Sequence, residues 1–182
     1  EMQVLGALLV VIFAALLWVL FRSFSAVLWP LVTILLCVLW TMGIPALVGV
    51  NLSVMIVLTL MLVFAVGIAD CVHVMSAYFT FRRDGIEHHR ALSMAYGKTG
   101  LAILITTITT MCGVMALTIS DLVLIQVFGW SSALGVLLAL IFTMALLPIL
   151  LDLWHPGSPS ADASLVDKLG ERWQALSSKT QI

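Results

Sequence analysis

Charged residues are scarce in this sequence. Lysine, arginine, aspartate and glutamate together make up 9% of its 182 residues, whereas a soluble domain carries about 25%. Hydrophobic residues make up 63%, and the mean hydropathy is +1.21. A composition so poor in charge excludes an ordinary soluble domain and indicates an integral membrane protein.

Several kinds of functional site are also missing from the sequence. Its three cysteines, Cys37, Cys71 and Cys112, lie in different apolar runs without CxxC spacing, so neither a disulfide framework nor a zinc site is predicted. There is no basic patch with interleaved aromatic residues, and we expect no nucleic-acid partner.

The chain starts with Glu1, and no signal-peptide pattern precedes the first apolar run. We therefore expect a segment of a longer protein.

Five apolar runs have the length of a membrane-spanning helix, which needs about 20 residues. They cover residues 4–21, 26–48, 53–81, 101–117 and 123–151. The sequence therefore predicts an all-α bundle over residues 1–154. Residues 155–182 are expected to form a linker and an amphipathic helix on the inner leaflet, because four apolar residues share one helical face. These are Leu165, Leu169, Trp173 and Leu176.

The basic residues predict the orientation of the bundle. With five spans, every lysine and arginine falls on the same side, whereas the opposite side carries only Glu1 and Asp121. The basic side of a membrane protein faces the cytoplasm. We therefore expect the N-terminus outside and the C-terminus inside, in a bacterial cytoplasmic membrane. The basic residues are Arg22, Arg82, Arg83, Arg90, Lys98, Lys168, Arg172 and Lys179.

The connection between the third and fourth runs contains two adjacent histidines. A turn signal at Arg83-Asp84-Gly85 precedes a segment, residues 86–96, that we expect to form a short helix at the membrane interface. His88 and His89 are interpreted as facing water or lipid headgroups. A metal site needs further ligands, and we expect none nearby.

The third run contains one acid, Asp70, and His73 follows it by one helical turn. An aspartate at the centre of a membrane helix costs about 2.5–3.5 kcal/mol, and such acids mark proton relays. Asp70 is about 17 residues, or about 25 Å, from the outer end of its run, which places it near mid-bilayer. Residues i and i+3 share a helical face, so we interpret Asp70 and His73 as proton-coupling residues. Purely structural hydrogen bonding is the alternative for either residue.

Hydroxylated and small residues are expected to surround the acid. Hydroxyl groups on the fourth run could serve a buried carboxylate or an ordered water, although inert packing is the alternative. They belong to Thr106, Thr107, Thr109 and Thr110. Small residues let a neighbouring helix approach closely. Those expected to do so are Gly67, Ala69, Gly113, Gly129 and Ala133.

The stretch Gly67-Ile68-Ala69-Asp70 also partly matches the Gly-x-Gly-Asp motif of intramembrane aspartyl proteases. Their chemistry needs two carboxylates that share a proton, and only one acid lies inside a predicted span. Ala69 stands in the place of the second glycine. We therefore expect no enzyme activity, no cofactor and no metal.

Together these motifs resemble the resistance-nodulation-division (RND) superfamily, and the most similar branch is that of the MMPL-type exporters, which are related to Patched and sterol-sensing domains. The matching stretches run in order over most of residues 4–151. They are residues 67–73, 78–83, 85–100, 106–113 and 128–151.

The resemblance implies that the five spans are helices two to six of one six-helix repeat, more in keeping with the N-terminal repeat. A further helix, a large extracytoplasmic domain and a second repeat would belong to the full-length protein, which could also be a homo-oligomer in contact with membrane lipids. The implied function is export of lipids or other amphiphiles driven by the proton gradient, with Asp70 as the coupling acid. Family members carry Asp-Asp or Asp-Tyr where this chain has Asp70-Cys71, so the substrate class does not carry over.

Two other functions fit the same resemblance. One is a non-transporting lipid-recognition or scaffold module similar to a sterol-sensing domain, in which bulky substitutions at Gly129 or Ala133 should matter more than the loss of Asp70. The other is a protein-translocation accessory of the same superfamily, which does not typically place a histidine three residues after the acid.

Overall fold

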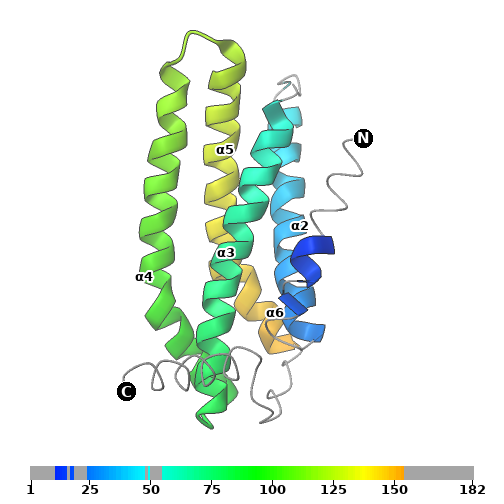
Figure 1. Cartoon of the computed structure of the whole chain (residues 1–182), viewed down its shortest axis with the longest axis vertical. Helices are drawn as coiled ribbons and strands as arrows, with labels where there is room; N and C mark the ends of the chain where they lie inside the picture. Colours follow the sequence, from blue (N-terminus) through cyan, green and yellow to red (C-terminus); the bar gives the residue numbers. More distant parts are fainter. Residues whose placement is uncertain (1–10, 16, 19–23, 48, 50–54, 154–182) are drawn as a thin grey trace, which may run out of the picture.

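A bundle of long helices makes up the computed structural model, which describes residues 11–15, 17–18, 24–47, 49 and 55–153 (Figure 1). The described part contains helices and turns and no strand. Residues 11–15 and 17–18 are helical. The other elements are α2 (Phe24–Leu47), α3 (Met55–Arg83), α4 (His88–Met115), the 3-10 helix η1 (Ala116–Ile119), α5 (Val123–Ile141), the π-helical turn η2 (Phe142–Leu146) and α6 (Leu147–Leu153).

Four helical segments of the described part are long and apolar enough to cross a membrane. They cover residues 26–47, 56–83, 88–119 and 123–153. The prediction of an all-α integral membrane protein is therefore confirmed. The first predicted span lies only partly within the described residues, and the expected linker and amphipathic helix at residues 155–182 lie outside them.

Helix α3 lies at the centre of the bundle and packs against α2, α4 and α5 (Figure 1). Its Val74, Met75 and Tyr78 are completely buried. Those three side chains recur at the spacing of one helical face. The face of α3 that carries them forms much of the apolar core, which positions the rest of α3 relative to its neighbours.

The short interfacial helix expected at residues 86–96 is not a separate element. Gly85, with φ of 79°, makes the turn after α3, and α4 then runs without interruption from His88 through the predicted fourth span. Ala91, Ala95 and Ile103 are buried along one side of it. This continuous packing stripe joins residues 88–96 and the apolar fourth run in one helix. An unbroken helix also satisfies its own backbone hydrogen bonds, as lipid requires.

The fifth span contains a π-helical turn, and the turn frees a carbonyl group. The backbone N–H of Leu147 bonds to the carbonyl of Phe142, five residues back. Pro148 has no N–H to offer the next carbonyl, that of Thr143. The hydroxyl of Tyr96 on α4 donates to that oxygen at 2.8 Å. The irregular turn thereby ties the end of the fifth span to α4.

The small residues that we expected to admit neighbouring helices divide into two groups. Gly67, Gly129 and Ala133 are buried among helices, and a Cβ on Gly67 would lie 3.3 Å from the Ile34 side chain of α2. Gly113 and Ala69 contradict the expectation. A Cβ on Gly113 would meet nothing within 4 Å in the described chain, and Ala69 is exposed. Hydropathy does not say which side of an apolar helix meets a neighbour, so the sequence could not separate the two groups.

Replacing Gly129 with alanine is expected to lower the free energy of unfolding by about 1–3 kcal/mol, the usual cost of overpacking. The new Cβ would lie 2.8 Å from the backbone oxygen of Val114 and 3.3 Å from the backbone nitrogen of Thr118. Backbone atoms cannot rotate away, so α5 would have to move from the end of α4.

Unfolding of the full-length protein in detergent, followed by circular dichroism during titration with dodecyl sulfate, measures this effect. The matched control is Gly113→Ala, which has open space and should be neutral or stabilising by up to about 1 kcal/mol. Equal destabilisation of both variants would contradict the packing argument.

Candidate functional site

A cavity of about 360 Å³ lies between α3 and α4. On α3 its wall follows residues one turn apart, and on α4 residues 98, 102, 106 and 110 form a facing stripe at the same spacing. The lining residues are Val66, Ala69, Asp70, His73, Lys98, Thr99, Ala102, Ile103, Thr106 and Thr110. The structure thus brings Asp70, His73 and part of the predicted threonine cluster to one cavity.

Asp70 is 5% exposed although it lines the cavity. Its Oδ2 atom is buried and has no hydrogen-bond partner among the described residues. Buried polar atoms are nearly always hydrogen-bonded, and an unpaired buried oxygen costs about 1–3 kcal/mol, more when it is charged. The described helices therefore enclose this carboxyl group without neutralising it, which is costly for a charged carboxylate and much less so for a protonated one.

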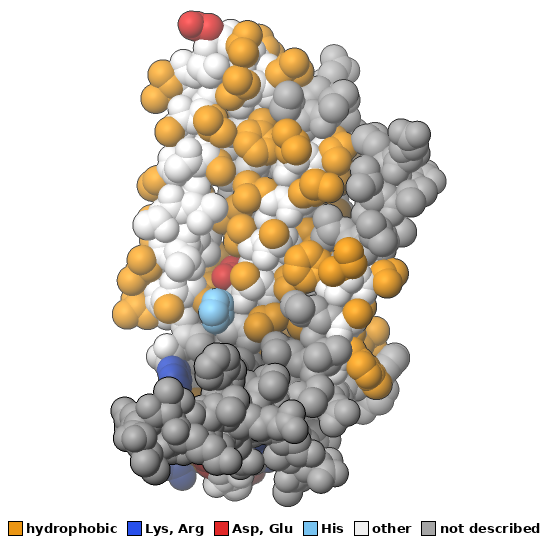
Figure 2. Space-filling model, viewed as in Figure 1, with side chains coloured by type: hydrophobic (Ala, Val, Ile, Leu, Met, Phe, Trp, Pro, Cys, Tyr) orange, Lys and Arg blue, Asp and Glu red, His pale blue; other side chains and the backbone are white. Residues whose placement is uncertain are grey.

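His73 lies on the same face of α3 as Asp70 and is exposed. No hydrogen bond joins the two side chains within the described part of the chain. Figure 2 shows a carboxylate and a histidine lying together in a surface of mostly apolar side chains. Because α3 runs toward Arg83, His73 is nearer than Asp70 to the end of the bundle where α3 ends and α4 begins, called the basic end here.

Lys98 is a cavity residue that the sequence did not point to. It comes eight residues, about two helical turns, before Thr106 and therefore lies toward the basic end. Its Nζ atom lies 5.8 Å from the centre of the Phe81 ring. Counting back from Thr106 in steps of four would have found it, since 98, 102 and 106 share a helical face.

The four threonines do not act as one cluster. Thr106 and Thr110 line the cavity, whereas Thr109 is exposed outside it, so the expectation for Thr109 is wrong in the described bundle. Thr107 is buried, and its hydroxyl has no partner among the described residues. Four polar residues within five positions cover more than one face of a helix, which is why they separate.

The hydroxyl groups at the cavity are already used as donors. Thr106 donates to the carbonyl of Ile103 at 2.9 Å, and Thr110 donates to that of Thr106 at 2.8 Å. A hydroxyl that donates its single proton offers only acceptor lone pairs to other groups. This wall of the cavity suits a water, a protonated carboxyl group or a cation better than it suits a carboxylate.

Cys71 stands where the similar exporters carry an aspartate or a tyrosine, and it faces away from the cavity. It is completely buried, and its Sγ atom lies 3.7 Å from the Thr143 hydroxyl of the fifth span. Asp70 and Cys71 therefore point into different spaces. Within the described bundle, the acid acts without its sequence neighbour.

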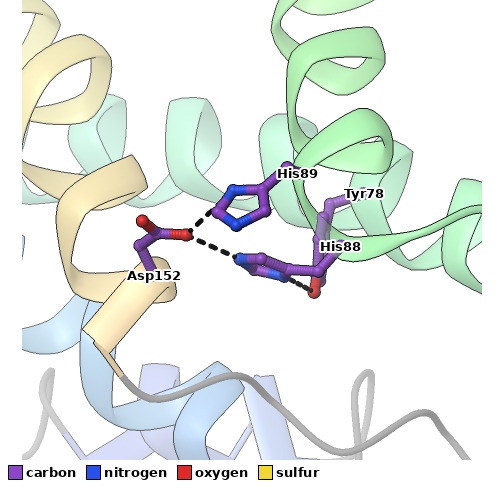
Figure 3. A network of polar contacts seen from close by, with 4 residues as sticks. All are labelled: Tyr78, His88, His89 and Asp152. Atoms are coloured by element: carbon purple, nitrogen blue, oxygen red, sulfur yellow. Dashed lines mark hydrogen bonds and ion pairs between the residues drawn. The ribbon is translucent and has the colours of Figure 1, made fainter.

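A second polar cluster lies at the basic end, where we expected solvated histidines. His88 is buried, and its Nδ1 and Nε2 atoms lie 2.7 Å from the Tyr78 hydroxyl and 3.1 Å from Asp152 Oδ1 (Figure 3). His89 is exposed, as expected, but its Nδ1 also lies 3.3 Å from Asp152 Oδ1. The expectation that no further ligand lies near the histidine pair is wrong, because α6 brings Asp152 from 64 residues away.

The chain matches a known protein family and two curated proteins. The profile of the MMPL family matches residues 1–179. Over 90 residues, 50% of the chain, the sequence is 33% identical to membrane protein MJ1562 of Methanocaldococcus jannaschii. Over 130 residues, 71% of the chain, it is 23% identical to membrane protein YdfJ of Bacillus subtilis. These matches cover 23% and 17% of the two proteins, so the chain spans less than a quarter of either relative. No solved structure matches the chain.

Proposed function

The chain belongs to the MMPL family, and we propose that it forms part of the membrane domain of an exporter that uses the proton gradient to move lipids or other amphiphiles. Asp70 binds and releases the coupling proton. The observation that carries this proposal is the buried Oδ2 of Asp70, which has no partner among the described residues and lies at a cavity between two spanning helices.

The energetic argument rests on the charge of that carboxyl group. A charged aspartate at the centre of a membrane helix costs about 2.5–3.5 kcal/mol, and binding a proton removes the charge. Moving one charge through a potential of about 100 mV is worth about 2.3 kcal/mol. Protonation at Asp70 can therefore shift the balance between two arrangements of the bundle.

The cavity also supports a path for the proton. His73 and Lys98 lie between Asp70 and the basic end, on facing helices. In the proposed mechanism the imidazole of His73 accepts a proton from Asp70 and passes it toward the basic end, through water held near Lys98. His73 is the relay and Thr106 and Thr110 are supporting acceptors.

The proposal extends to parts of the protein outside this chain. Because midplane coupling sites of such transporters lie between repeats, a second repeat and an extracytoplasmic domain would complete the site and the export path, and the assembly could be a homo-oligomer. The basic end would face the cytoplasm of a bacterial inner membrane. The chain by itself is not expected to transport anything.

A second function has one observation in its favour. The volume of the cavity, about 360 Å³, lies in the range of about 300–1,000 Å³ typical of small-molecule pockets, and most of its lining side chains are apolar or small. A module that recognises a lipid without transporting it could use this cavity. In that case the protonation of Asp70 would not matter.

Infrared difference spectroscopy tests the proton-binding step without knowledge of the substrate. The full-length protein in lipid vesicles should show the C=O band of a protonated carboxyl group that changes with pH, and Asp70→Asn should remove one such component. The control is Asp121→Asn, which changes an exposed acid beyond the cavity and should leave that component in place. Identical spectra for the wild type and Asp70→Asn would contradict proton binding at this residue.

A further inference from the structure

The polar cluster at the basic end combines side chains from three helices. Tyr78 belongs to α3, His88 and His89 form the first turn of α4, and Asp152 belongs to α6. Figure 3 shows both imidazole rings directed at the carboxylate, with the phenol on the far side of His88. None of the four lines the cavity of Asp70. The cluster is thus a separate feature, and the proposed export mechanism does not use it.

The potential donor atoms of the cluster are already spaced as in a metal site. His88 Nε2 and His89 Nδ1 lie 3.1 and 3.3 Å from the same atom, Asp152 Oδ1, and all three ligand atoms lie within 4.8 Å of one another. Metal–donor bonds of about 2.0–2.1 Å at tetrahedral angles put neighbouring donors about 3.3 Å apart in a zinc site. Small side-chain rotations would bring all three atoms onto one ion.

The surroundings of His88 match those of a metal-ligating histidine. Its side chain is 7% exposed, and the Tyr78 hydroxyl at Nδ1 fixes the ring so that Nε2 points at Asp152. A ligating histidine typically carries its proton on the nitrogen that does not bind the metal and donates it to an outer group. The Tyr78 oxygen can accept that bond, because a phenol is both donor and acceptor.

The other two donors leave the cluster open to solvent. The side chains of His89 and Asp152 are 71% and 49% exposed. An ion could therefore enter from solution, and a water could occupy a fourth position. Two imidazoles and a single carboxylate favour Zn²⁺ and similar transition-metal ions over Mg²⁺ or Ca²⁺, which prefer oxygen ligands.

We propose that His88 Nε2, His89 Nδ1 and Asp152 Oδ1 form a binding site for Zn²⁺ or a similar divalent transition-metal ion, and that Tyr78 positions His88 within it. The ion would join the start of α4 to the end of the fifth span. It would hold these two helices together at the basic end of the bundle.

Zinc titration of the full-length protein tests this site. After treatment with a chelator, the purified protein in detergent is titrated with Zn²⁺ by isothermal calorimetry. His89→Ala and Asp152→Asn should each remove one binding site per chain or weaken it at least about tenfold, a difference of about 1.4 kcal/mol. Both residues are exposed, so their substitution should leave the fold intact. His73→Ala, which removes an exposed imidazole from the other site, should bind as the wild type does.

A spectroscopic signature and an outer-shell variant distinguish a metal site from a simple hydrogen-bond network. Co²⁺ bound to the wild type should give the intense visible bands of a tetrahedral ion, and His89→Ala should change them. Tyr78→Phe should weaken Zn²⁺ binding by about 10- to 100-fold, the usual effect of losing an outer-shell partner. Absence of Zn²⁺ binding in the wild type, or unchanged binding in both His89→Ala and Asp152→Asn, would overturn the proposal and leave the cluster as a hydrogen-bonded contact between helices.

Discussion

Replacing Asp70 with asparagine is expected to abolish export that is driven by the proton gradient in the full-length protein. Asparagine keeps nearly the same shape and remains polar, but it cannot gain or lose a proton near neutral pH. Asp70 is buried at the cavity and its Oδ2 has no partner among the described residues, so no existing ion pair would be broken. We expect the variant to fold and to insert normally, and to lose only the coupling.

Proteoliposomes with an imposed pH gradient provide the measurement, with Nile red as a lipid-like fluorescent probe. Efflux from Asp70→Asn vesicles should fall to that of empty vesicles, at least about tenfold below the wild type, which corresponds to about 1.4 kcal/mol or more. Asp121→Asn makes the same chemical change at an exposed acid and should transport normally. Undiminished efflux by Asp70→Asn would end the proposal that this acid is the coupling group.

The membrane-spanning helices could be predicted from the sequence because the lipid bilayer restricts the length and composition of such helices. A helix that crosses the membrane needs about 20 apolar residues and few charges, and the runs from Ala26 onward meet that condition. Hydropathy could not show that α4 begins at His88, before its apolar part. The cause lies in tertiary packing, since Ala91 and Ala95 are buried against the bundle.

Asp70 and His73 could be predicted as neighbours because one helix carries both. The same reasoning treated all four threonines as partners, whereas the rotation of α4 turns only Thr106 and Thr110 of these four to the cavity. That rotation follows from contacts with α3 and α5, which no local pattern contains.

The contact between His88 and Asp152 could not be predicted from the sequence, for a related reason. The two residues are 64 positions apart, and their contact depends on the turn after α3 and on the length of the fifth span together. A histidine pair beside a turn gave the only signal. Asp152, at the end of an apolar run, was indistinguishable from an ordinary solvated acid.

Filling the cavity is expected to stop export without unfolding the protein. Ala102 on α4 lines the cavity and is exposed, so Ala102→Phe can place its ring in the open space beside Asp70 and His73. The ring would displace water and block proton movement from Asp70 toward the basic end. We expect Nile red efflux in proteoliposomes to fall at least about tenfold, or about 1.4 kcal/mol, and the stability in detergent to stay near that of the wild type.

The matched control for this variant is Leu101→Phe, which adds a ring at the neighbouring, exposed position outside the cavity. Its efflux should equal that of the wild type, and normal efflux by Ala102→Phe would show that the cavity has no part in transport. Comparison with Asp70→Asn then separates the two functions. An exporter coupled at Asp70 loses Nile red efflux in both variants. A lipid-recognition module shows no efflux above empty vesicles even as the wild type, and its binding of Nile red persists in Asp70→Asn and is lost in Ala102→Phe. Gly129 cannot serve in this comparison, because its contacts are with the end of α4 and not with the cavity.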